Sequence, residues 1–420
     1  MLDIKFIRQN PEKVKEACKN KQVTVDVDRI LELDKKRREE TKRLEELRAE
    51  QNKISKQAPE KLEIEKAREI KEKIREVEPE LERIEKEFNG LMFQIPNIPS
   101  EDVPVGKDET GNVVIRKVGK IPKFSCLPAG RNFKPKDYME IAENLDLIDV
   151  KRAAKISGAR FSYIKNELVL MHFALMRFGL DVLVKEGFIP LLPPKMITAK
   201  MAWGMGYLEQ TDDEESYFLP KDNLYLIATS EQSMGAMHSG EVLPEKDLPK
   251  RYVGFTACFR REAGSYGKDT KGILRSHEFD KLEMFSLSRP GDSKKEHEYF
   301  LSLEEKLMKL LELPYQVVNI CTGDLGRPAA KKYDIETWLP GQNRYRETHS
   351  TSNCTDFQTR RLNIRYKDKF GKLDFVHAVN GTAFSMRPLI AILENYQQKD
   401  GSVKIPKVLQ KYLPFKVIKK

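Results

Sequence analysis

The sequence predicts an α+β protein in which a long antiparallel pair of helices precedes an antiparallel β-sheet domain flanked by helices. Three observations favour this fold. Residues 1–90 combine dense charge with a heptad pattern, residues 95–108 are rich in proline, and strand-like and helical runs share the remainder of the 420 residues. At about 150 residues per domain, this length suggests two or three domains.

The first 90 residues contain 24 Lys or Arg and 23 Asp or Glu. Apolar residues at alternating spacings of four and three predict one seam of a helix, and they are Ile70, Ile74, Val77, Leu81, Ile84 and Phe88. An upstream helix fits the same register with Ile30, Leu33, Leu44, Leu47 and Ile54, although Arg37, Glu40 and Gln51 occupy the intervening seam positions. Pro79 is expected to kink the second helix or to end its first part. The short stretch Ser55–Pro59 predicts that the two helices fold back on each other.

A domain boundary is expected in the linker 95–108, which contains Pro96, Pro99 and Pro104. We therefore predict domains 1–105 and 106–420. In the second domain, helices are expected at 167–185 and 297–311, and extended segments at 189–192, 225–228, 253–259, 282–287 and through most of 315–376. Adjacent strands with helices gathered at their flanks indicate an antiparallel sheet.

Composition narrows the class of protein. With 33% charged and 40% apolar residues the chain is expected to be globular, and no apolar run approaches the roughly 20 residues that a membrane span requires. The first residues resemble neither a secretory signal nor a transit peptide, which predicts a cytoplasmic protein. Five scattered cysteines argue against a disulfide framework. A net charge of +10 favours a polyanionic partner, and RNA, DNA and ATP all fit.

Common nucleotide and metal signatures are missing from the sequence. The run 264–268 lacks P-loop spacing, and Gly204-Met205-Gly206 lacks the third glycine of a dinucleotide fingerprint. Glu296-His297-Glu298 has no second histidine one turn away, so it is better explained as a helix surface than as a zinc site.

Arginines and carboxylates in otherwise apolar strand-like runs are the best candidates for chemistry. Arg260 and Glu262 follow the run 253–258, and in a strand they would share one face. After a polar, glycine-rich turn, a return strand carries a second alternating set on one face: Arg275, His277, Phe279, Lys281 and Glu283. An adenosine phosphate with an amine-bearing partner would require such a set, but cross-strand salt bridges between solvated strands are the structural alternative.

These motifs resemble those of the seryl-tRNA synthetases, which are class II aminoacyl-tRNA synthetases. The run 258–269, continued by 275–279 and Glu283, is similar to the second class II motif, and 187–194 behind a long helix is similar to the first, which builds the dimer interface in the family. Thr229-Ser230-Glu231 resembles the serine-binding T-x-E element, while 353–361 and the tail 390–397 with Arg387 resemble further family segments. The resemblance extends from Leu2 to about Leu413.

The resemblance implies a tRNA-binding coiled-coil arm in residues 1–105 and a class II catalytic domain with a six-stranded antiparallel sheet in 106–420. It implies a homodimeric cytoplasmic ligase that forms seryl-adenylate from L-serine and ATP and transfers serine to the 3′ end of tRNA(Ser). Neither a membrane nor DNA is an expected partner, and the sequence leaves open whether tRNA(Sec) is a substrate.

The resemblance also implies roles for individual residues. Arg260 would hold the α-phosphate and the serine carboxylate, Glu262 the adenine amino group, and Arg275 the β- and γ-phosphates. Phe279 and Arg387 would sandwich the adenine, and Arg260 and Arg387 are the expected catalytic residues. Glu347 and Ser350 would bind Mg²⁺, whose preferred ligands are hard oxygens. The remaining expected ATP-binding residues are Arg261, Thr348 and His349.

The expected serine-binding residues are Thr229, Ser230, Glu231 and Glu283 for the ammonium and hydroxyl groups, with Asn380 and Thr382 near the hydroxyl. Each set has a structural alternative: Thr229-Ser230-Glu231 also fits a helix N-cap, and Glu347 could be a sheet-edge charge. Departures from the family pattern are Glu278 in place of a common Gln, Thr348-His349 in place of small or apolar residues, and a step from Asn380 to Arg387 that is one residue shorter than in many relatives.

Two alternative functions stay open at this point. A synthetase-like protein could aminoacylate a carrier protein, although a carrier needs no tRNA-binding arm. A non-catalytic RNA-binding protein could also retain the synthetase body, and it would form no seryl-adenylate.

Overall fold

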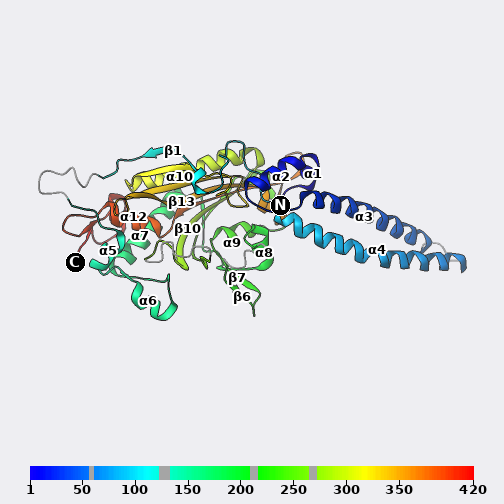
Figure 1. Cartoon of the computed structure of the whole chain (residues 1–420), viewed down its shortest axis with the longest axis horizontal. Coiled ribbons are helices and arrows are strands. Elements are labelled where there is room, and N and C mark those ends of the chain that lie inside the picture. The colour runs from blue at the N-terminus through cyan, green and yellow to red at the C-terminus, as the bar shows by residue number, and fades with distance from the viewer. Residues whose placement is uncertain (56–60, 123–132, 209–215, 264–271) are drawn as a thin grey trace. The chain divides into compact units, whose positions relative to one another are not determined.

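The computed structural model describes residues 1–55, 61–122, 133–208, 216–263 and 272–420 (Figure 1). Its contacts divide the chain into two compact units, Met1–Ile98 and Pro99–Lys420. Most of the predicted turn 55–59 and of the glycine-rich turn 263–272 lies outside the described residues. Among the helices of the described residues, none is both long enough and apolar enough to span a bilayer.

The segment just after the first unit is bonded to the second unit. The Ser100 amide donates to the Ala330 carbonyl at 2.8 Å, and the Thr322 amide donates to the Pro104 carbonyl at 2.9 Å. Val103 packs with Leu325 and Ala329 in a small buried cluster. The boundary expected after residue 105 stays a prediction.

The first unit consists of helices α1 (Ile4–Gln9), α2 (Pro11–Asn20), α3 (Val27–Ser55) and α4 (Lys61–Gln94). α3 and α4 lie side by side along most of their length (Figure 1), as the predicted helical hairpin requires. The predicted seam is confirmed, because Ile70, Ile74, Val77, Ile84 and Phe88 are each 9% exposed or less.

α4 continues through Pro79, so the prediction that this residue ends the first part of the helix is wrong. Proline removes one helical amide, but Pro79 lies on the exposed side of the helix. The seam residues Val77 and Ile84 remain buried on either side of it. Packing along the seam therefore outweighs the local cost of the proline.

The polar middle of the seam is built around a buried carboxylate. Asp34 is 1% exposed and pairs with Arg8 at 2.9 Å, with Arg38 at 3.1 Å and with Arg37 at 3.4 Å. The Arg37 guanidinium also lies 4.6 Å from the centroid of the Phe88 ring. Arg37 thus occupies its seam position by covering an aromatic ring and neutralising an acid.

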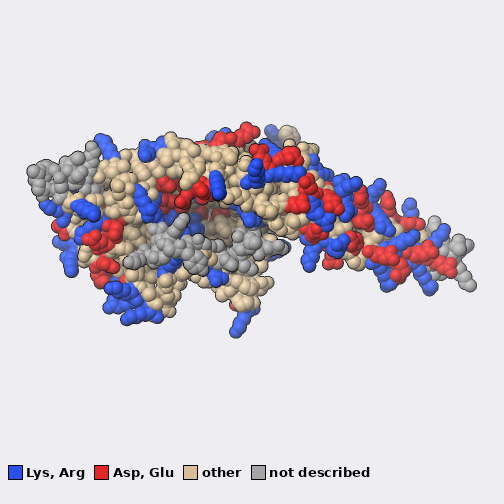
Figure 2. Space-filling view, viewed as in Figure 1, with Lys and Arg blue, Asp and Glu red and all other residues tan. Residues whose placement is uncertain are grey.

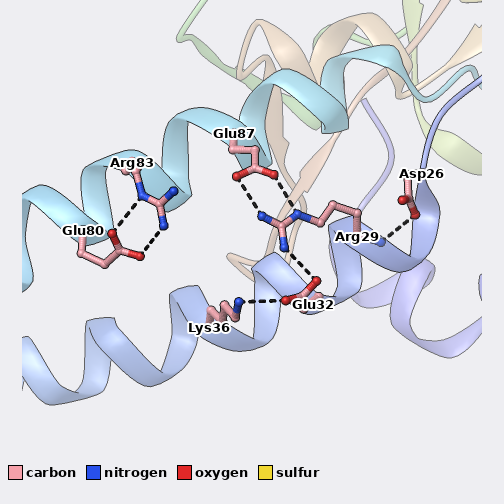
Figure 3. Close-up of polar contacts among 7 residues, drawn as sticks. All are labelled: Asp26, Arg29, Glu32, Lys36, Glu80, Arg83 and Glu87. Carbon is pink, nitrogen blue, oxygen red and sulfur yellow. Dashed lines mark hydrogen bonds and ion pairs between the residues drawn. The ribbon is translucent and has the colours of Figure 1, made fainter.

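Ion pairs lie along the outside of the helical hairpin (Figure 3). Arg29 of α3 donates two hydrogen bonds to Glu87 of α4, at 2.7 and 3.0 Å, and a third to Glu32 at 2.8 Å. Acidic and basic side chains are interspersed over this surface (Figure 2), in keeping with the near balance of charge in residues 1–90. Each exposed pair contributes little stability, and Arg29–Glu87 and Arg48–Glu78 connect the two helices.

An eight-stranded sheet forms the centre of the second unit, in the order β1-β11-β12-β13-β16-β10-β9-β4. Its strands are β1 (Val113–Val118), β4 (Ile189–Leu191), β9 (Lys250–Phe259), β10 (Glu278–Ser288), β11 (Tyr315–Asn319), β12 (Lys331–Leu339), β13 (Arg344–Thr355) and β16 (His377–Phe384). The six strands from β11 to β9 are antiparallel, as expected. The sheet has eight strands and not six, because β1 adds antiparallel to β11 and β4 adds parallel to β9.

Shorter sheets and helices surround this sheet. The short strands form the sheets β15-β14-β8, β5-β7-β6, β2-β3 and β17-β18. Their bounds are β2 (Ile148–Asp149), β3 (Tyr163–Ile164), β5 (Met196–Thr198), β6 (Phe218–Leu219), β7 (Leu224–Leu226), β8 (Val242–Pro244), β14 (Arg365–Lys367), β15 (Leu373–Phe375), β17 (Val403–Lys404) and β18 (Val417–Ile418). The helices are α5 (Tyr138–Asn144), α6 (Val150–Ser157), α7 (Asn166–Lys185), α8 (Ala199–Met205), α9 (Glu231–Ala236), α10 (Ser293–Leu310), α11 (Phe357–Arg361) and α12 (Arg387–Asn395).

Helices α7, α10 and α12 contribute to the main core, which covers one face of the large sheet. α7 and α10 confirm the two helices predicted in this unit. Gly179 lets α7 approach the sheet closely, because a Cβ at this position would lie 2.7 Å from the Phe384 ring. On β16, Gly381 faces Phe300 and Glu304 of α10. Its neighbours Asn380 and Thr382 therefore point to the opposite face.

Candidate active site

Three adjoining cavities lie on the face of the sheet to which Asn380 and Thr382 point. The central cavity has a volume of about 490 Å³, the deep cavity about 310 Å³ and the outer cavity about 600 Å³. Arg260 and Ser350 line both the central and the deep cavity. Arg275, Glu347 and Arg387 line both the central and the outer cavity. The three cavities therefore form one continuous cleft.

Strand alternation delivers several side chains to this cleft. Phe279 and Lys281 of β10 line the central cavity, and Glu283 lines the deep cavity. On the neighbouring strand β16, Thr382 is paired with Glu283 in the ladder. Paired residues share a face, so the carboxylate and the hydroxyl group lie next to each other.

Arg260 and Glu262 reach the central cavity by a route that differs from the prediction. β9 ends at Phe259, and Glu262 has a φ of 53°, so the period-two argument does not apply to this pair. The Arg260 amide donates to the His277 carbonyl at 2.9 Å, after which the chain turns. The turn brings both side chains to the central cavity. The Arg260 guanidinium lies 5.1 Å from the centroid of the Phe279 ring.

A β-bulge brings Glu347 and Ser350 together. Residues three apart in a regular strand point to opposite faces. Glu347 pairs with Glu336 and His349 pairs with Ile335, which leaves Thr348 as the extra residue. Both Glu347 and Ser350 consequently line the central cavity.

Cations and carboxylates of the central cavity are paired with each other. Arg387 Nη1 lies 3.0 Å from Glu347 Oε2, and Arg275 Nη1 lies 3.0 Å from Glu262 Oε2. The Glu347 side chain is 44% exposed, so partial desolvation in the cleft opposes its ionisation only weakly, and the Arg387 and Lys332 cations lower the pKa of its carboxyl to about 2. Glu347 is therefore ionised at neutral pH.

The deep cavity contains two buried carboxylates with different partners. Glu283 is 1% exposed and lies 2.5 Å from the Lys281 ammonium. Burial raises the pKa of Glu283, and the Lys281 cation partly offsets this rise. Glu231 is held by two hydrogen bonds, from the Tyr207 hydroxyl at 2.8 Å and from the Gln358 amide at 2.7 Å.

The outer cavity has mixed charge. Lys332, Asp334 and Glu336 come from alternate positions of β12, and Arg344 and Arg346 come from β13. Burial and the nearby Glu347 charge raise the pKa of Asp334 to about 7, against the attraction of Lys332. Within the described residues, no group of three or more His, Cys, Asp or Glu could hold a metal ion by itself.

Most of the predicted site residues meet in this cleft. Those that line it are Thr229, Glu231, Arg260, Glu262, Arg275, Phe279, Glu283, Glu347, Thr348, Ser350, Asn380, Thr382 and Arg387. The structural alternative of solvated cross-strand pairs does not describe this set, because Thr229, Glu231 and Glu283 are each 4% exposed or less.

Three predicted residues point elsewhere. The Ser230 hydroxyl donates to the Gly254 carbonyl of β9 at 3.3 Å, and the Arg261 side chain is exposed. His349 lies on the core side of the sheet, with its ring centroid 5.8 Å from that of Phe384. Burial lowers the pKa of His349 to about 3. These positions give no support to the ligand roles expected for the three residues.

Several cleft residues were not identified in the sequence. Three of them could have been found from the sequence, because charged residues alternate along a strand that is otherwise largely buried. They are Lys332, Asp334 and Glu336. Tyr207 follows α8 and Gln358 belongs to α11, so only the tertiary fold brings them to Glu231.

The cleft can bind a molecule with both a phosphate and an ammonium group. Arg260 and Arg275 provide bidentate donors for phosphate, and Phe279 provides an aromatic face. The carboxylates of Glu231 and Glu283 can hold an ammonium group in the deep cavity. Reactions that join two anions are promoted by such positioning and positive charge.

Comparisons with known proteins give a consistent result. Residues 1–99 match the seryl-tRNA synthetase N-terminal domain, and residues 216–396 match the tRNA synthetase class II core domain (G, H, P, S and T). The chain is 48% identical over 429 residues to the serine–tRNA ligase of Dictyoglomus thermophilum, with coverage of 100% of this chain and 99% of the relative.

Two solved structures are similar over the whole chain. The seryl-tRNA synthetase from Pyrococcus horikoshii complexed with ATP matches with a TM-score of 0.90 and 44% identity, and the cytoplasmic serine–tRNA ligase from Naegleria fowleri in complex with AMP matches with 0.87 and 35%. In both cases the match covers 100% of this chain and 99% of the other.

Proposed function

The chain belongs to the seryl-tRNA synthetase family, and from this premise we propose how its own residues activate serine and charge tRNA. It is a serine–tRNA ligase. The serine carboxylate attacks the α-phosphate of ATP, which forms seryl-adenylate and releases pyrophosphate. A terminal ribose hydroxyl of tRNA(Ser) then attacks the seryl carbonyl, which forms the ester and releases AMP.

ATP occupies the central and outer cavities in this proposal. Phe279 and Arg387 stack on the two faces of the adenine, and Glu262 accepts a hydrogen bond from its amino group. Arg260 neutralises the α-phosphate together with the incoming carboxylate, whereas Arg275 binds the β- and γ-phosphates. The position of Arg260 is the main support for this proposal, because Arg260 lines both the central and the deep cavity and can contact both reactants there.

Serine occupies the deep cavity. Glu231, oriented by Tyr207 and Gln358, accepts the ammonium group, and Thr229 and Glu283 complete the set. Asn380 and Thr382 lie near the serine hydroxyl. A cavity whose buried polar groups pair with a hydroxyl rejects alanine, since those groups would otherwise stay unsatisfied.

Mg²⁺ fits two oxygen donors that line the central cavity. The Glu347 carboxylate and the Ser350 hydroxyl supply two oxygens, and ATP phosphates and water would supply the others, which is the usual arrangement for this ion. When bound, the ion neutralises phosphate charge. Glu347 keeps a negative charge for it at neutral pH because its pKa is about 2.

The protein is a homodimer in this proposal, assembled through α7 and the segment that follows it. Large apolar side chains are exposed there, namely Leu170 at 46%, Phe173 at 58%, Ile189 at 46% and Leu192 at 83%. β4 is also an edge strand of the large sheet, and its free edge suits pairing with a second copy.

The hairpin of α3 and α4 is the arm that contacts tRNA, and the enzyme acts in the cytoplasm. The balanced charge of residues 1–90 means that local basic groups, and not overall charge, attract the nucleic acid there. Whether tRNA(Sec) is also charged is a matter for direct assay with both tRNAs. The full-length similarity to serine–tRNA ligases favours tRNA charging over the carrier-protein and non-catalytic alternatives.

Serine-dependent exchange of pyrophosphate into ATP tests the activation step. Wild-type protein should exchange with serine and much less with threonine or alanine. Arg260→Ala should slow exchange by roughly 100-fold or more, as expected for loss of a charge-stabilising donor. Arg152→Ala removes an exposed arginine of α6 and is the matched control. Equal rates for the two variants would contradict the proposal.

A further inference from the structure

The small sheet β15-β14-β8 has one buried face and one open face. Leu243 is 5% exposed and packs with Tyr366 in a hydrophobic cluster beneath the sheet. Residues that are paired in neighbouring strands point to the same face of a sheet. The face opposite Leu243 and Tyr366 therefore carries Val242, Pro244, Arg365, Lys367, Leu373 and Phe375. Val242 and Leu373 are 43% and 46% exposed, so this second face is open to solvent.

An aromatic ring projects from the turn between β14 and β15. Phe370 is 83% exposed, an unusual position for a phenylalanine. The turn is fixed by Asp368, whose Oδ1 accepts the amides of Phe370 at 2.9 Å and of Lys372 at 2.8 Å. Gly371 supplies the left-handed conformation that closes the turn, with a φ of 85°. The ring is thus presented by an ordered turn.

Three lysines lie within five residues of this ring in the sequence, on the same strand–turn–strand segment. Lys367, Lys369 and Lys372 are exposed, and none of them pairs with a carboxylate of the described residues. The Lys369 ammonium lies 5.0 Å from the centroid of the Phe370 ring.

The nearby carboxylates already have partners of their own. Asp368 caps the turn, Asp374 accepts the Phe375 amide at 2.8 Å, and Glu245 pairs with Arg289 at 3.1 Å. Asp368 and Asp374 keep their negative charges and offset two of the three lysines, whereas Glu245 is neutralised by Arg289. Arg365 adds a positive charge on the open face, which is therefore weakly basic as well as aromatic.

We propose that this basic aromatic surface, made of Phe370, Lys367, Lys369 and Lys372, binds tRNA. Phe370 stacks on an unpaired base while the three ammonium groups contact phosphates, a combination typical of proteins that bind single-stranded RNA. The inference rests on the proposed tRNA-charging function, which supplies a polyanionic substrate. A second copy of the chain is a poorer occupant, because lysines are depleted in protein interfaces.

Binding of labelled tRNA(Ser) to the full-length protein, measured by fluorescence anisotropy over a series of salt concentrations, tests this surface. Phe370→Ala should weaken binding about 10-fold, and Phe370→Trp should restore it, since stacking on one base is worth about this much. The double variant Lys369→Gln/Lys372→Gln should reduce the slope of log affinity against log salt by about 1 to 2. Lys295→Gln/Lys309→Gln, two exposed lysines of α10, is the matched control.

Serine-dependent pyrophosphate exchange, measured without tRNA, separates this surface from the active site. Each variant should retain wild-type exchange, because none of the altered residues lines the cleft. A wild type without exchange would refute the proposed function and not the tRNA contact. Affinities and salt slopes equal to those of the control would overturn the tRNA contact. A loss of dimer in Phe370→Ala, with unchanged tRNA affinity, would overturn it in favour of a second copy.

Discussion

Arg387 is bonded to both the side chain and the main chain of Glu347. Its Nη1 lies 3.0 Å from the carboxylate Oε2 and 3.1 Å from the carbonyl oxygen. The proposed adenine-stacking cation and the proposed Mg²⁺ ligand thus hold each other in place before the nucleotide binds. In the proposed complex, the Glu347 carboxylate would exchange part of its pairing with Arg387 for Mg²⁺.

Glu347→Gln should therefore raise the Mg²⁺ concentration that the enzyme requires more than it raises the KM for serine. The amide keeps a hydrogen bond to Arg387 but removes the charge that attracts Mg²⁺. We expect the Mg²⁺ concentration for half-maximal pyrophosphate exchange to rise roughly 10-fold to 100-fold. Glu140→Gln, an exposed position on α5, is the matched control. If Glu347→Gln and Glu140→Gln require the same Mg²⁺ concentration for half-maximal exchange, Glu347 is not a Mg²⁺ ligand.

Lys281→Met should move the pH profile of serine activation. Lys281 lies 2.5 Å from Glu283 and offsets part of the burial that raises the pKa of this carboxyl. Without the cation, the pKa of Glu283 should rise further, so that this carboxyl takes up its proton at a higher pH. The acid limb of kcat/KM for serine should shift upward, so that activity at pH 6 falls more than activity at pH 8.

Lys281→Arg, which retains the positive charge, should keep a profile close to that of the wild type. Parallel profiles for the Met variant and the wild type would show that Glu283 does not need this cation.

The parts of the fold that follow a regular period could be predicted from sequence. Ile70 to Phe88 marked the seam of α4 because burial along a helix repeats with its turn. Phe279, Lys281 and Glu283 were predicted to share a face because β10 alternates there. In both cases a local rule coincides with the tertiary packing.

The positions that escaped prediction depend on irregular backbone or distant contacts. His349 was expected in the ATP site with Glu347 and Ser350, but the bulge at Thr348 turns it to the other face of the sheet. Neither Thr348 nor its neighbours carry a residue type that marks a bulge. Gln358 reaches Glu231 only through packing of α11 near α8, which no periodicity encodes.

Phe173→Glu should dissociate the proposed homodimer. Phe173 is 58% exposed on α7, and a carboxylate there would have to be buried in the interface without a partner. We expect the dimer to weaken by roughly 100-fold or more, measured by sedimentation equilibrium over a range of protein concentrations. Leu310→Glu, at a 41% exposed position on α10, should leave the dimer intact. A dimer that withstands Phe173→Glu would place the interface elsewhere.

His297→Gln should make the free energy of unfolding depend less on pH between pH 7 and pH 5. His297 is 1% exposed, its Nε2 lies 3.0 Å from the Thr351 carbonyl, and its ring stacks on Tyr333. Burial lowers the pKa of His297 from 6.5 to about 4. Between these values the unfolded chain binds a proton that the native protein does not. Native stability therefore falls as the pH drops below 6.5, with a slope that approaches about 1.4 kcal/mol per pH unit from this residue.

Glutamine retains a donor for the Thr351 carbonyl but does not titrate in this range. Urea denaturation at pH 7, 6 and 5 should show a lower stability for the variant at pH 7, and a smaller decrease towards pH 5 than in the wild type. The difference between the two proteins should therefore narrow as the pH falls. If instead the two free energies of unfolding decrease in parallel, His297 takes up its proton at the same pH in the native and the unfolded protein, and its burial next to Tyr333 does not lower its pKa.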